Sequence, residues 1–412
     1  MAGATEYYVC LKNADGRWES VASVDGDTTT YLDEMAINGE VSCYGVRAVS
    51  EYGKSDVQGK EITYITAPTL TLSNTKTGIS LKWDANEEAD SYYIYRRTSP
   101  SKGWSRIATV TKNSHTDTKV TAGTTYYYTI KAVKGKATSS YKSDGWSYRF
   151  LKIPSHKSLS NGYGSVVFSW NKVAGATGYI VYRKVNGADT WTNLGKTKST
   201  SYTDKDVVNK SNYQYTVRAY YGSSLSSFTA GKVIKYLAAP KLKVSNTTSS
   251  VKLEWEKVSG ASSYYVYRKA GSAKSWTKVA TVTRNYYNDT NIKSGVKYTY
   301  TIKAYGSKTT SGYYKTGWPI VYLKAPKISS ISSKTNGVNI KWNKITGASG
   351  YIVYRNDGVN GWENVGKTTA NSKVTFVDKT AKKGVTYTYA IRAYRGNCRS
   401  AYYSNVKCKV KY

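Results

Sequence analysis

The chain has 412 residues, with 61 Lys and Arg against 26 Asp and Glu, and therefore a formal net charge of +35. It contains 42 Tyr and 11 Trp but only four Phe and two Met, a composition that favours strands over helices. The sequence has no run of about 18 apolar residues, so we expect no membrane-spanning helix. Its six prolines are too few for a disordered Pro-rich chain.

Residues 1–66 form an acidic segment, with 5 Lys/Arg against 11 Asp/Glu, whereas residues 67–412 carry a net charge of +41. The runs at 7–10 and 44–48, with Trp18 between them, recur in the same order in every later unit. The two strands that open those later units are missing. We therefore predict that residues 1–66 are a partial domain lacking its first two strands, and the least stable part of the chain.

The rest of the chain is a repeat whose units open on Pro68, Pro154, Pro240 and Pro326, each 86 residues after the one before. A fixed period of this size indicates one structural unit copied along the chain. The predicted domains are 67–152, 153–238, 239–324 and 325–412.

Each unit shows the same strand signals in the same order. An alternating strand ends in a first tryptophan, and a Tyr-rich strand ending in Arg follows. A second tryptophan comes next, and then a longer Tyr-x-Tyr strand. About seven short strands with turns every 8–12 residues indicate an antiparallel sandwich. The first tryptophans are Trp83, Trp170, Trp255 and Trp342, and the long strands lie at 126–132, 213–219, 298–304 and 387–393.

These motifs resemble the fibronectin type III family, in the form found as tandem arrays in secreted proteins of Gram-positive, mostly clostridial, bacteria. The resemblance covers nearly the whole chain. It implies an all-β array of immunoglobulin-like β-sandwiches in a semi-rigid rod. It also implies that the first Tyr of each long strand, such as Tyr126, bonds nearby backbone through its hydroxyl as a tyrosine corner.

A longer period pairs the units as A-B-A-B. Units one and three share an extra tryptophan, Trp146 and Trp318, which units two and four lack. We expect alternate joints to differ in geometry, or alternate domains to present different surfaces. Trp146 and Trp318 are therefore candidates for ligand binding, and a role at the domain joint is equally consistent with the pattern.

The second tryptophans are the other candidates for binding. Alternation along the strands places them next to outward tyrosines, in a flat aromatic surface that can stack on sugars or anchor a protein. The alternative, that Trp and Tyr only stabilise the hairpin, is favoured because the Trp recurs in every unit. These tryptophans are Trp104, Trp191, Trp276 and Trp362, with Trp18 in the partial domain.

The last unit is the most basic, and Lys382, Lys383, Arg395 and Arg399 are candidate contacts for a polyanion. A surface of one charge sign attracts polyanions in a salt-dependent way. Specific nucleic-acid binding is not expected, because no groove-reading helix or single-strand platform is evident.

We find no catalytic, cofactor or metal motif. The two histidines, His115 and His156, have no convergent partners and are expected to be solvated surface residues. Cys10 and Cys43 fall on neighbouring strands and could form a disulfide in an oxidising compartment. An acidic cluster at residues 84–90 is expected to be a solvated loop or a contact with a basic neighbour rather than a calcium site.

We therefore expect a non-enzymatic, monomeric, extracellular rod at a bacterial cell surface. It would act as a spacer and adhesion region that displays or tethers other domains and binds a polyanionic polymer or a protein. The first alternative is a carbohydrate-binding accessory to a secreted glycan-active enzyme. The second is capture of a host protein such as an immunoglobulin.

Overall fold

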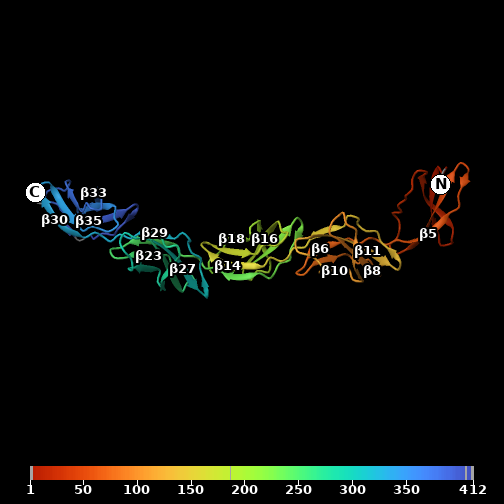
Figure 1. Cartoon of the computed structure of the whole chain (residues 1–412), viewed down its shortest axis with the longest axis horizontal. Helices are drawn as coiled ribbons and strands as arrows, with labels where there is room; N and C mark the ends of the chain where they lie inside the picture. Colours follow the sequence, from red (N-terminus) through yellow and green to blue (C-terminus); the bar gives the residue numbers. More distant parts are fainter. Residues whose placement is uncertain (1–2, 186, 404–405, 410–412) are drawn as a thin grey trace.

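The computed structural model describes residues 3–185, 187–403 and 406–409. These residues contain strands and no helix, so nothing among them could cross a bilayer as an apolar helix. The strands group into successive modules that follow one another in a single row, and the two termini lie at opposite ends of it (Figure 1). The prediction of an all-β tandem array of fibronectin type III-like sandwiches is confirmed.

The first module is one five-stranded sheet, here called the N-terminal sheet. Its order is β2-β1-β3-β4, with β5 also paired to β3. Its strands are β1 (Glu6–Lys12), β2 (Trp18–Asp25), β3 (Val41–Ser50), β4 (Gly53–Lys54) and β5 (Gln58–Thr63).

Domains 1 and 2 each contain eight strands. Those of domain 1 are β6 (Thr71–Asn74), β7 (Ile79–Lys82), β8 (Ser91–Arg97), β9 (Ser105–Val110), β10 (Ser114–Asp117), β11 (Thr125–Lys134), β12 (Ala137–Thr138) and β13 (Trp146–Arg149). Those of domain 2 are β14 (His156–Gly162), β15 (Ser165–Trp170), β16 (Gly178–Val185), β17 (Thr192–Thr197), β18 (Ser201–Asp204), β19 (Asn212–Tyr221), β20 (Ser224–Leu225) and β21 (Lys232–Lys235).

Domains 3 and 4 repeat the same series. Domain 3 has β22 (Leu242–Asn246), β23 (Val251–Trp255), β24 (Ser263–Ala270), β25 (Thr277–Val282), β26 (Tyr286–Asp289), β27 (Lys297–Gly306), β28 (Thr309–Thr310) and β29 (Trp318–Val321). Domain 4 has β30 (Ile328–Lys334), β31 (Gly337–Trp342), β32 (Gly350–Asn356), β33 (Trp362–Thr368), β34 (Thr375–Asp378), β35 (Thr386–Arg395), β36 (Cys398–Arg399) and β37 (Val406–Lys409).

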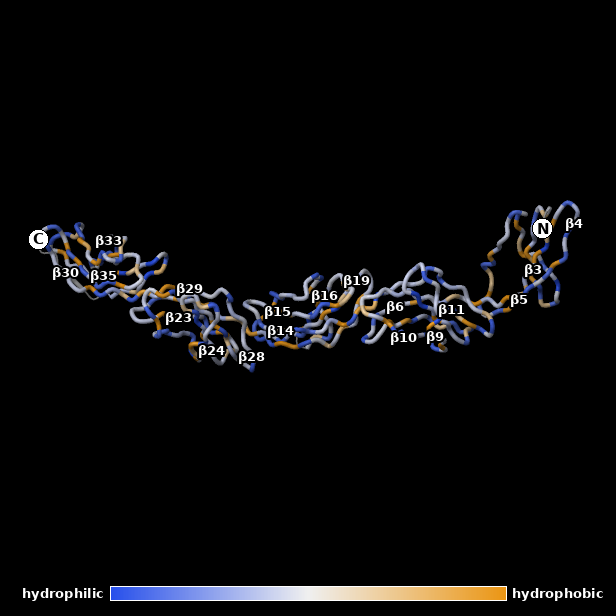
Figure 2. Tube along the Cα trace, in the orientation of Figure 1, coloured by the Kyte–Doolittle hydropathy of each residue, from blue (hydrophilic) through white to orange (hydrophobic). Residues whose placement is uncertain are grey.

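Each complete domain packs a three-stranded sheet on a five-stranded one. In domain 3 the orders are β22-β23-β26 and β25-β24-β27-β28, with β29 also paired to β27. Because successive side chains on a strand point to opposite faces, each sheet contributes every second residue to the core between them. Each of the four domains has its own cluster of buried residues, and apolar segments recur along the strands of every domain (Figure 2).

Tryptophan and tyrosine organise this core. The first tryptophan is buried in each domain and meets a strand tyrosine edge-on, as Trp255 meets Tyr264 with ring centroids 5.2 Å apart. The predicted tyrosine corner is confirmed, because the Tyr126 hydroxyl accepts a hydrogen bond from the Thr121 backbone N–H at 2.8 Å. The copies of this bond are made by Tyr213, Tyr298 and Tyr387.

A buried polar triad joins the two sheets of each domain. In domain 3 the Arg268 guanidinium on β24 contacts the Asp289 carboxylate on β26 at 2.7 Å, and the Tyr300 hydroxyl on β27 donates to the same carboxylate at 2.9 Å. A buried carboxylate must be paired and hydrogen-bonded to be tolerated. The other triads are Arg96–Asp117–Tyr128, Arg183–Asp204–Tyr215 and Arg355–Asp378–Tyr389.

Successive domains are joined by a repeated asparagine contact. At the end of the first hairpin strand of domain 2, the Asn161 amide donates to the Lys235 carbonyl of its own domain at 3.1 Å. The same nitrogen donates to the Thr310 carbonyl of domain 3 at 3.0 Å. One side chain thus ties the last strand of one domain to the short hairpin strand of the next. Asn74 and Asn246 make the equivalent pairs of bonds at the other two joints.

The joints nevertheless alternate in their closest contact. At the joint between domains 1 and 2, Gly175 packs directly against Gly123. A β-carbon on Gly175 would lie 2.4 Å from the Cα of Gly123, so there is no room for a side chain. Gly347 and Gly295 repeat this contact between domains 3 and 4. Between domains 2 and 3 the corresponding residue is Lys210, with φ of 72°. Joint contacts therefore follow the paired repeat seen in the sequence.

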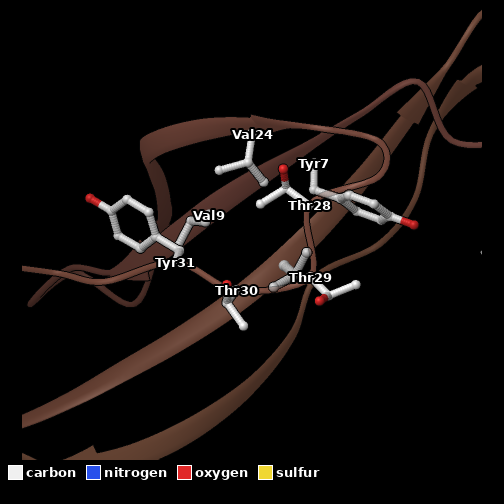
Figure 3. A pocket seen from close by; sticks show the side chains of 8 residues that line it. Tyr7, Val9, Val24, Thr28, Thr29, Thr30 and Tyr31 are labelled. Carbon is white, nitrogen blue, oxygen red and sulfur yellow. The ribbon is translucent and has the colours of Figure 1, made fainter.

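One face of the N-terminal sheet is only partly covered: Val9 and Ala48 on it are 7% and 8% exposed, but other positions are open to solvent. On that face Val46 is 53% exposed, whereas its equivalent Ile302 in domain 3 is 1% exposed. Tyr7, Val9, Tyr31 and the residues around them line a hollow of about 210 Å³ (Figure 3). The opposing three-stranded sheet, which buries this face in domains 1–4, has no counterpart among residues 3–66.

Candidate functional site

The candidate site is a cluster of aromatic and basic side chains on the outer face of each five-stranded sheet, here called the outer aromatic cluster. It combines a strand tyrosine, the second tryptophan, a cation from the long strand and an aromatic residue from the loop before the last strand. Its members in domains 1 to 4 are Tyr95, Trp104, Lys131 and Tyr141; Tyr182, Trp191, Arg218 and Phe228; Tyr267, Trp276, Lys303 and Tyr313; and Tyr354, Trp362, Arg392 and Tyr402.

Ring contacts and cations hold the members of each cluster together. In domain 1, Tyr95, Trp104, Lys131 and Tyr141 line a hollow of about 130 Å³, and the Lys131 ammonium lies 4.8 Å from the Tyr141 ring centroid. Each cluster therefore combines aromatic rings with a positive charge, the kinds of group that bind sugar rings and anions. Domains 2 and 3 show related contacts around Phe228 and Tyr313.

The second tryptophans also support the hairpin, as the alternative interpretation holds. The Trp276 ring has two close contacts. Gly317 packs against one end of the ring, since a β-carbon on this glycine would lie 2.6 Å from it. The Lys269 ammonium lies over the ring, 4.6 Å from its centroid. Gly145 and Gly231 have the same relation to Trp104 and Trp191, and the capping cations there are Arg97 and Lys184.

The extra tryptophans lie at the start of the last strand of domains 1 and 3, half-buried at the edge of the core. The Trp318 ring centroid is 4.9 Å from that of Tyr314 and 6.3 Å from that of Tyr163 in domain 2. Trp318 therefore belongs to a joint. Trp146 instead has the Lys142 ammonium 5.1 Å from its ring.

The structure separates the four basic residues predicted for polyanion binding. Arg395 and Arg399 flank the hairpin that faces domain 3, and the Arg395 guanidinium donates to the Gly295 carbonyl there at 3.0 Å. Lys382 and Lys383 lie beside the tyrosine corner of Tyr387. That corner faces the following domain in domains 1 and 3, where Gly123 and Gly295 make the joints. The four residues therefore do not form one patch.

The possible disulfide between Cys10 and Cys43 is not formed in the structure, and both thiols are free. Cys10 lies opposite Gly45 on β3, whereas Cys43 lies opposite Glu61 on β5. The two cysteines are thus diagonal neighbours, about 7–8 Å apart in such a register, which exceeds the usual span of a disulfide. Cys10 is also only 2% exposed.

The two histidines lie on strands, and the acidic cluster lies where the N-terminal sheet meets domain 1. His115 and His156 are half-buried on β10 and β14 rather than solvated, and burial lowers the pKa of each imidazole. Glu88 pairs with Lys134, whose ammonium also donates to the Gly39 carbonyl of the N-terminal sheet at 3.0 Å. The acidic cluster therefore lies at the first joint. The described residues contain no group of three or more His, Cys, Asp or Glu side chains placed to hold a metal ion.

Several ionisable groups with perturbed pKa values belong to the triads. Burial and the neighbouring Asp289 raise the pKa of Tyr300 well above its usual value of 10.0. The neutral phenol is then a permanent hydrogen-bond donor to the carboxylate. Burial acts to lower the pKa of Arg268, but its bond to Asp289 outweighs this and raises it. These groups stabilise the sandwich.

Sequence reasoning missed the triads and the asparagine joints. Both were detectable as repeated residues: the acid lies 11 residues before the long-strand tyrosine in every domain. The joint asparagine lies five residues before a buried strand residue with which it pairs. Without a fold, nothing indicated that these positions meet.

No known protein-family profile matches the chain. The chain is 27% identical over 298 residues to Exoglucanase B of Cellulomonas fimi, covering 62% of this chain and 26% of that protein. It is 33% identical over 126 residues to a poly(3-hydroxybutyrate) depolymerase of Ralstonia pickettii, covering 30% of this chain and 24% of that protein. A match to the Amylopullulanase of Thermoanaerobacter thermohydrosulfuricus has 28% identity and covers 32% of this chain and 10% of that protein.

The chain thus spans about a quarter or less of these curated relatives. Among solved structures, the chicken CNTN1 FN1-FN3 domains match 63% of this chain and 99% of that one, with 14% identity and a TM-score of 0.25. That whole-chain score is too low for the match to carry an argument about function.

Proposed function

We propose that the chain is a non-catalytic extracellular spacer and adhesion region. It displays or tethers other domains, and it binds a polyanionic polymer or a protein at a cell surface. Relatives named for the breakdown of polymers favour an extracellular location. The matched segment is a small share of each of them, which favours a region attached to other domains. The net charge of +41 on residues 67–412 favours an anionic partner.

The observation that carries the spacer proposal is the asparagine contact repeated at three successive joints. Each amide uses both of its N–H donors on two backbone carbonyls from two domains, which sets the angle as well as the distance between them. The connections are a few residues long and contain a proline, so they offer little slack. A row of domains held in this way keeps its ends apart.

Small-angle X-ray scattering of Asn161→Ala tests the spacer. The variant loses two hydrogen bonds worth about 0.5–1.5 kcal/mol each, so we expect a broader distribution of shapes and a smaller radius of gyration. Asn288→Ala, which removes an exposed asparagine of β26, is the matched control and leaves the scattering unchanged. Scattering from the Asn161 variant that coincides with the wild type would refute a joint held by this side chain.

Retention on immobilised anionic polymer, measured from low to high salt, tests the adhesion part. We expect retention that falls as salt is added, because surface charges are screened within about 10 Å at 0.1 M. A chain that elutes from every anionic polymer at low salt would exclude this part of the proposal.

A second candidate is a carbohydrate-binding accessory to a secreted glycan-active enzyme. The observation that favours it is the match to Exoglucanase B across 62% of this chain. This candidate predicts retention on neutral polysaccharide that persists in high salt. Absence of such retention would leave the spacer and adhesion proposal as the better account.

A further inference from the structure

The outer aromatic cluster differs between domain 4 and the other three domains at one position. In domains 1–3 a cation covers the ring of the second tryptophan, and it is the residue that follows the last paired arginine of the Tyr-rich strand. The Arg97, Lys184 and Lys269 cationic groups lie 4.3, 5.1 and 4.6 Å from the ring centroids of Trp104, Trp191 and Trp276. A cation at that distance occupies the ring face on which a ligand would stack.

In domain 4 the residue opposite Trp362 is Asn356. Its side-chain oxygen accepts a hydrogen bond from the Gly358 backbone N–H at 2.6 Å, so the asparagine holds the turn instead of covering the ring. Trp362 is 37% exposed. The structure describes all the tryptophans of the chain, and each of the others is buried or partly buried.

An aromatic ring and a fixed cation adjoin the open tryptophan. The Tyr402 ring, also 37% exposed, has its centroid 5.6 Å from that of Trp362 in an edge-on arrangement. The Arg392 guanidinium lies 5.6 Å from the Tyr402 centroid, and its Nε donates to the Ser400 carbonyl at 2.8 Å. The Nε bond orients the guanidinium, and an oriented guanidinium binds a carboxylate in a fixed geometry.

We propose that Trp362, Tyr402 and Arg392 form a binding site for an acidic polysaccharide, which rests on the proposed adhesion to an anionic polymer. The apolar face of a pyranose ring stacks on Trp362 and Tyr402, and the carboxylate of the sugar pairs with Arg392. Residues 325–412 carry 16 Lys and Arg against three Asp and Glu, which raises the local concentration of such a polymer. Domains 1–3 carry the same cluster in a covered form.

The test uses the whole chain with polygalacturonate as the probe, in isothermal titration at constant salt. Trp362→Ala should weaken binding about tenfold, as loss of a central aromatic anchor does, and Trp362→Phe should retain most of it. Because the second tryptophans also support the hairpin, the thermal unfolding of both variants is measured beside the binding, and a variant that keeps Trp362 is needed to exclude misfolding as the cause.

Asn356→Lys provides a sharper test, because it adds a positive charge and yet should weaken binding. A lysine there covers Trp362 as Lys269 covers Trp276. The reverse change in domain 2, Lys184→Asn, removes a charge but uncovers Trp191, so it should raise the number of sites titrated. General charge attraction predicts the opposite sign for both variants.

The outcomes separate this site from the proposed function. Wild-type binding that Trp362→Ala leaves unchanged, or that Asn356→Lys strengthens, overturns the site while adhesion to anionic polymer stands. The same holds if other anionic polymers bind and polygalacturonate does not. Equal binding of the methyl-esterified polymer overturns the pairing of Arg392 with a carboxylate. If the wild type binds no anionic polymer at all, the site and the proposed adhesion to such a polymer both fail.

Discussion

The N-terminal sheet and domain 3 contain the same five-stranded sheet, once without and once with a second sheet packed against it. β1 and β3 pair in the register of β24 and β27, so that Val9 lies opposite Val46 as Val266 lies opposite Ile302. The positions agree but their burial agrees only in part: Val9 is buried like Val266, at 7% and 0% exposed, whereas Val46 is 53% exposed and Ile302 1%. A strand pattern thus assigns a residue to a face, and only the opposing sheet buries the whole of that face as a core.

The same comparison divides the buried triad into a local and a long-range part. In the N-terminal sheet the Tyr44 hydroxyl still donates to Asp33, 11 residues earlier, as Tyr300 does to Asp289. The arginine is absent: Leu11 stands at the position of Arg268. The Tyr–Asp pair therefore forms without the second sheet, and the arginine accompanies the buried carboxylate of the complete sandwich.

The largest expected effect is that of Arg268→Leu, which introduces the residue of the N-terminal sheet into domain 3. The Asp289 side chain, 1% exposed, would lose its countercharge, at a cost of about 3–5 kcal/mol. Hydrogen exchange read by mass spectrometry over residues 263–306 should show the loss of protection. Lys252→Leu, which breaks an exposed pair with Glu254, should cost at most about 1 kcal/mol. Equal effects of the two changes would contradict a structural role for the triad.

A matched pair of core truncations should show the next largest difference. Ile302→Ala removes a fully buried side chain and should cost about 2–5 kcal/mol. Val46→Ala, at the corresponding position of the N-terminal sheet, should change stability by no more than about 0.5 kcal/mol. Hydrogen exchange over residues 41–50 and 297–306 measures both. A large effect of Val46→Ala would mean that its face is covered in solution.

The smallest expected effect is the dependence of stability on pH, which should differ between domain 4, with Asp378, and the N-terminal sheet, with Asp33. Burial acts to raise the pKa of Asp378, but hydrogen bonds from Thr380 and Tyr389 and the charge of Arg355 lower it from the usual 3.8. Since the folded-state pKa lies below the unfolded one, this stabilisation is complete above about pH 4. It is lost as the pH falls through the folded-state value.

Hydrogen exchange in domain 4 between pH 5 and pH 2, set against model peptides to remove the intrinsic dependence on pH, measures this loss. Asp378→Asn should flatten the profile. The hydrogen bond from Tyr44 likewise lowers the pKa of Asp33, but that carboxylate is more exposed, so its pH effect should be smaller. A steeper acid loss in the N-terminal sheet than in domain 4 would reverse the comparison.

Much of the architecture was predictable because it repeats. The first tryptophans, the tyrosine corners and the outward strand tyrosines recur at fixed positions, and periodicity alone assigns them to a face. The asparagines of the joints also recur, but repetition did not show what they contact. Asn161 lies in a polar stretch of the first hairpin, and its two acceptors, Lys235 and Thr310, are 74 and 149 residues away.

The candidate sites show the same division. The second tryptophans were found from the sequence, but their exposure was not, since it depends on the cross-strand residue. Trp276 and Trp362 look alike along the chain, and Lys269 covers one while Asn356 leaves the other open. Likewise, Arg395 and Lys382 are 13 residues apart but lie at opposite ends of domain 4.

By itself, the sequence determined the all-β class, the unit of repetition and its pairing, and the residues that face inward, because these depend on alternation and periodicity along the chain. Only the tertiary structure decided which polar side chains meet, how successive domains are joined, and which aromatic ring is left open. Those outcomes depend on register between strands and on contacts between residues far apart in the sequence, which no local pattern encodes.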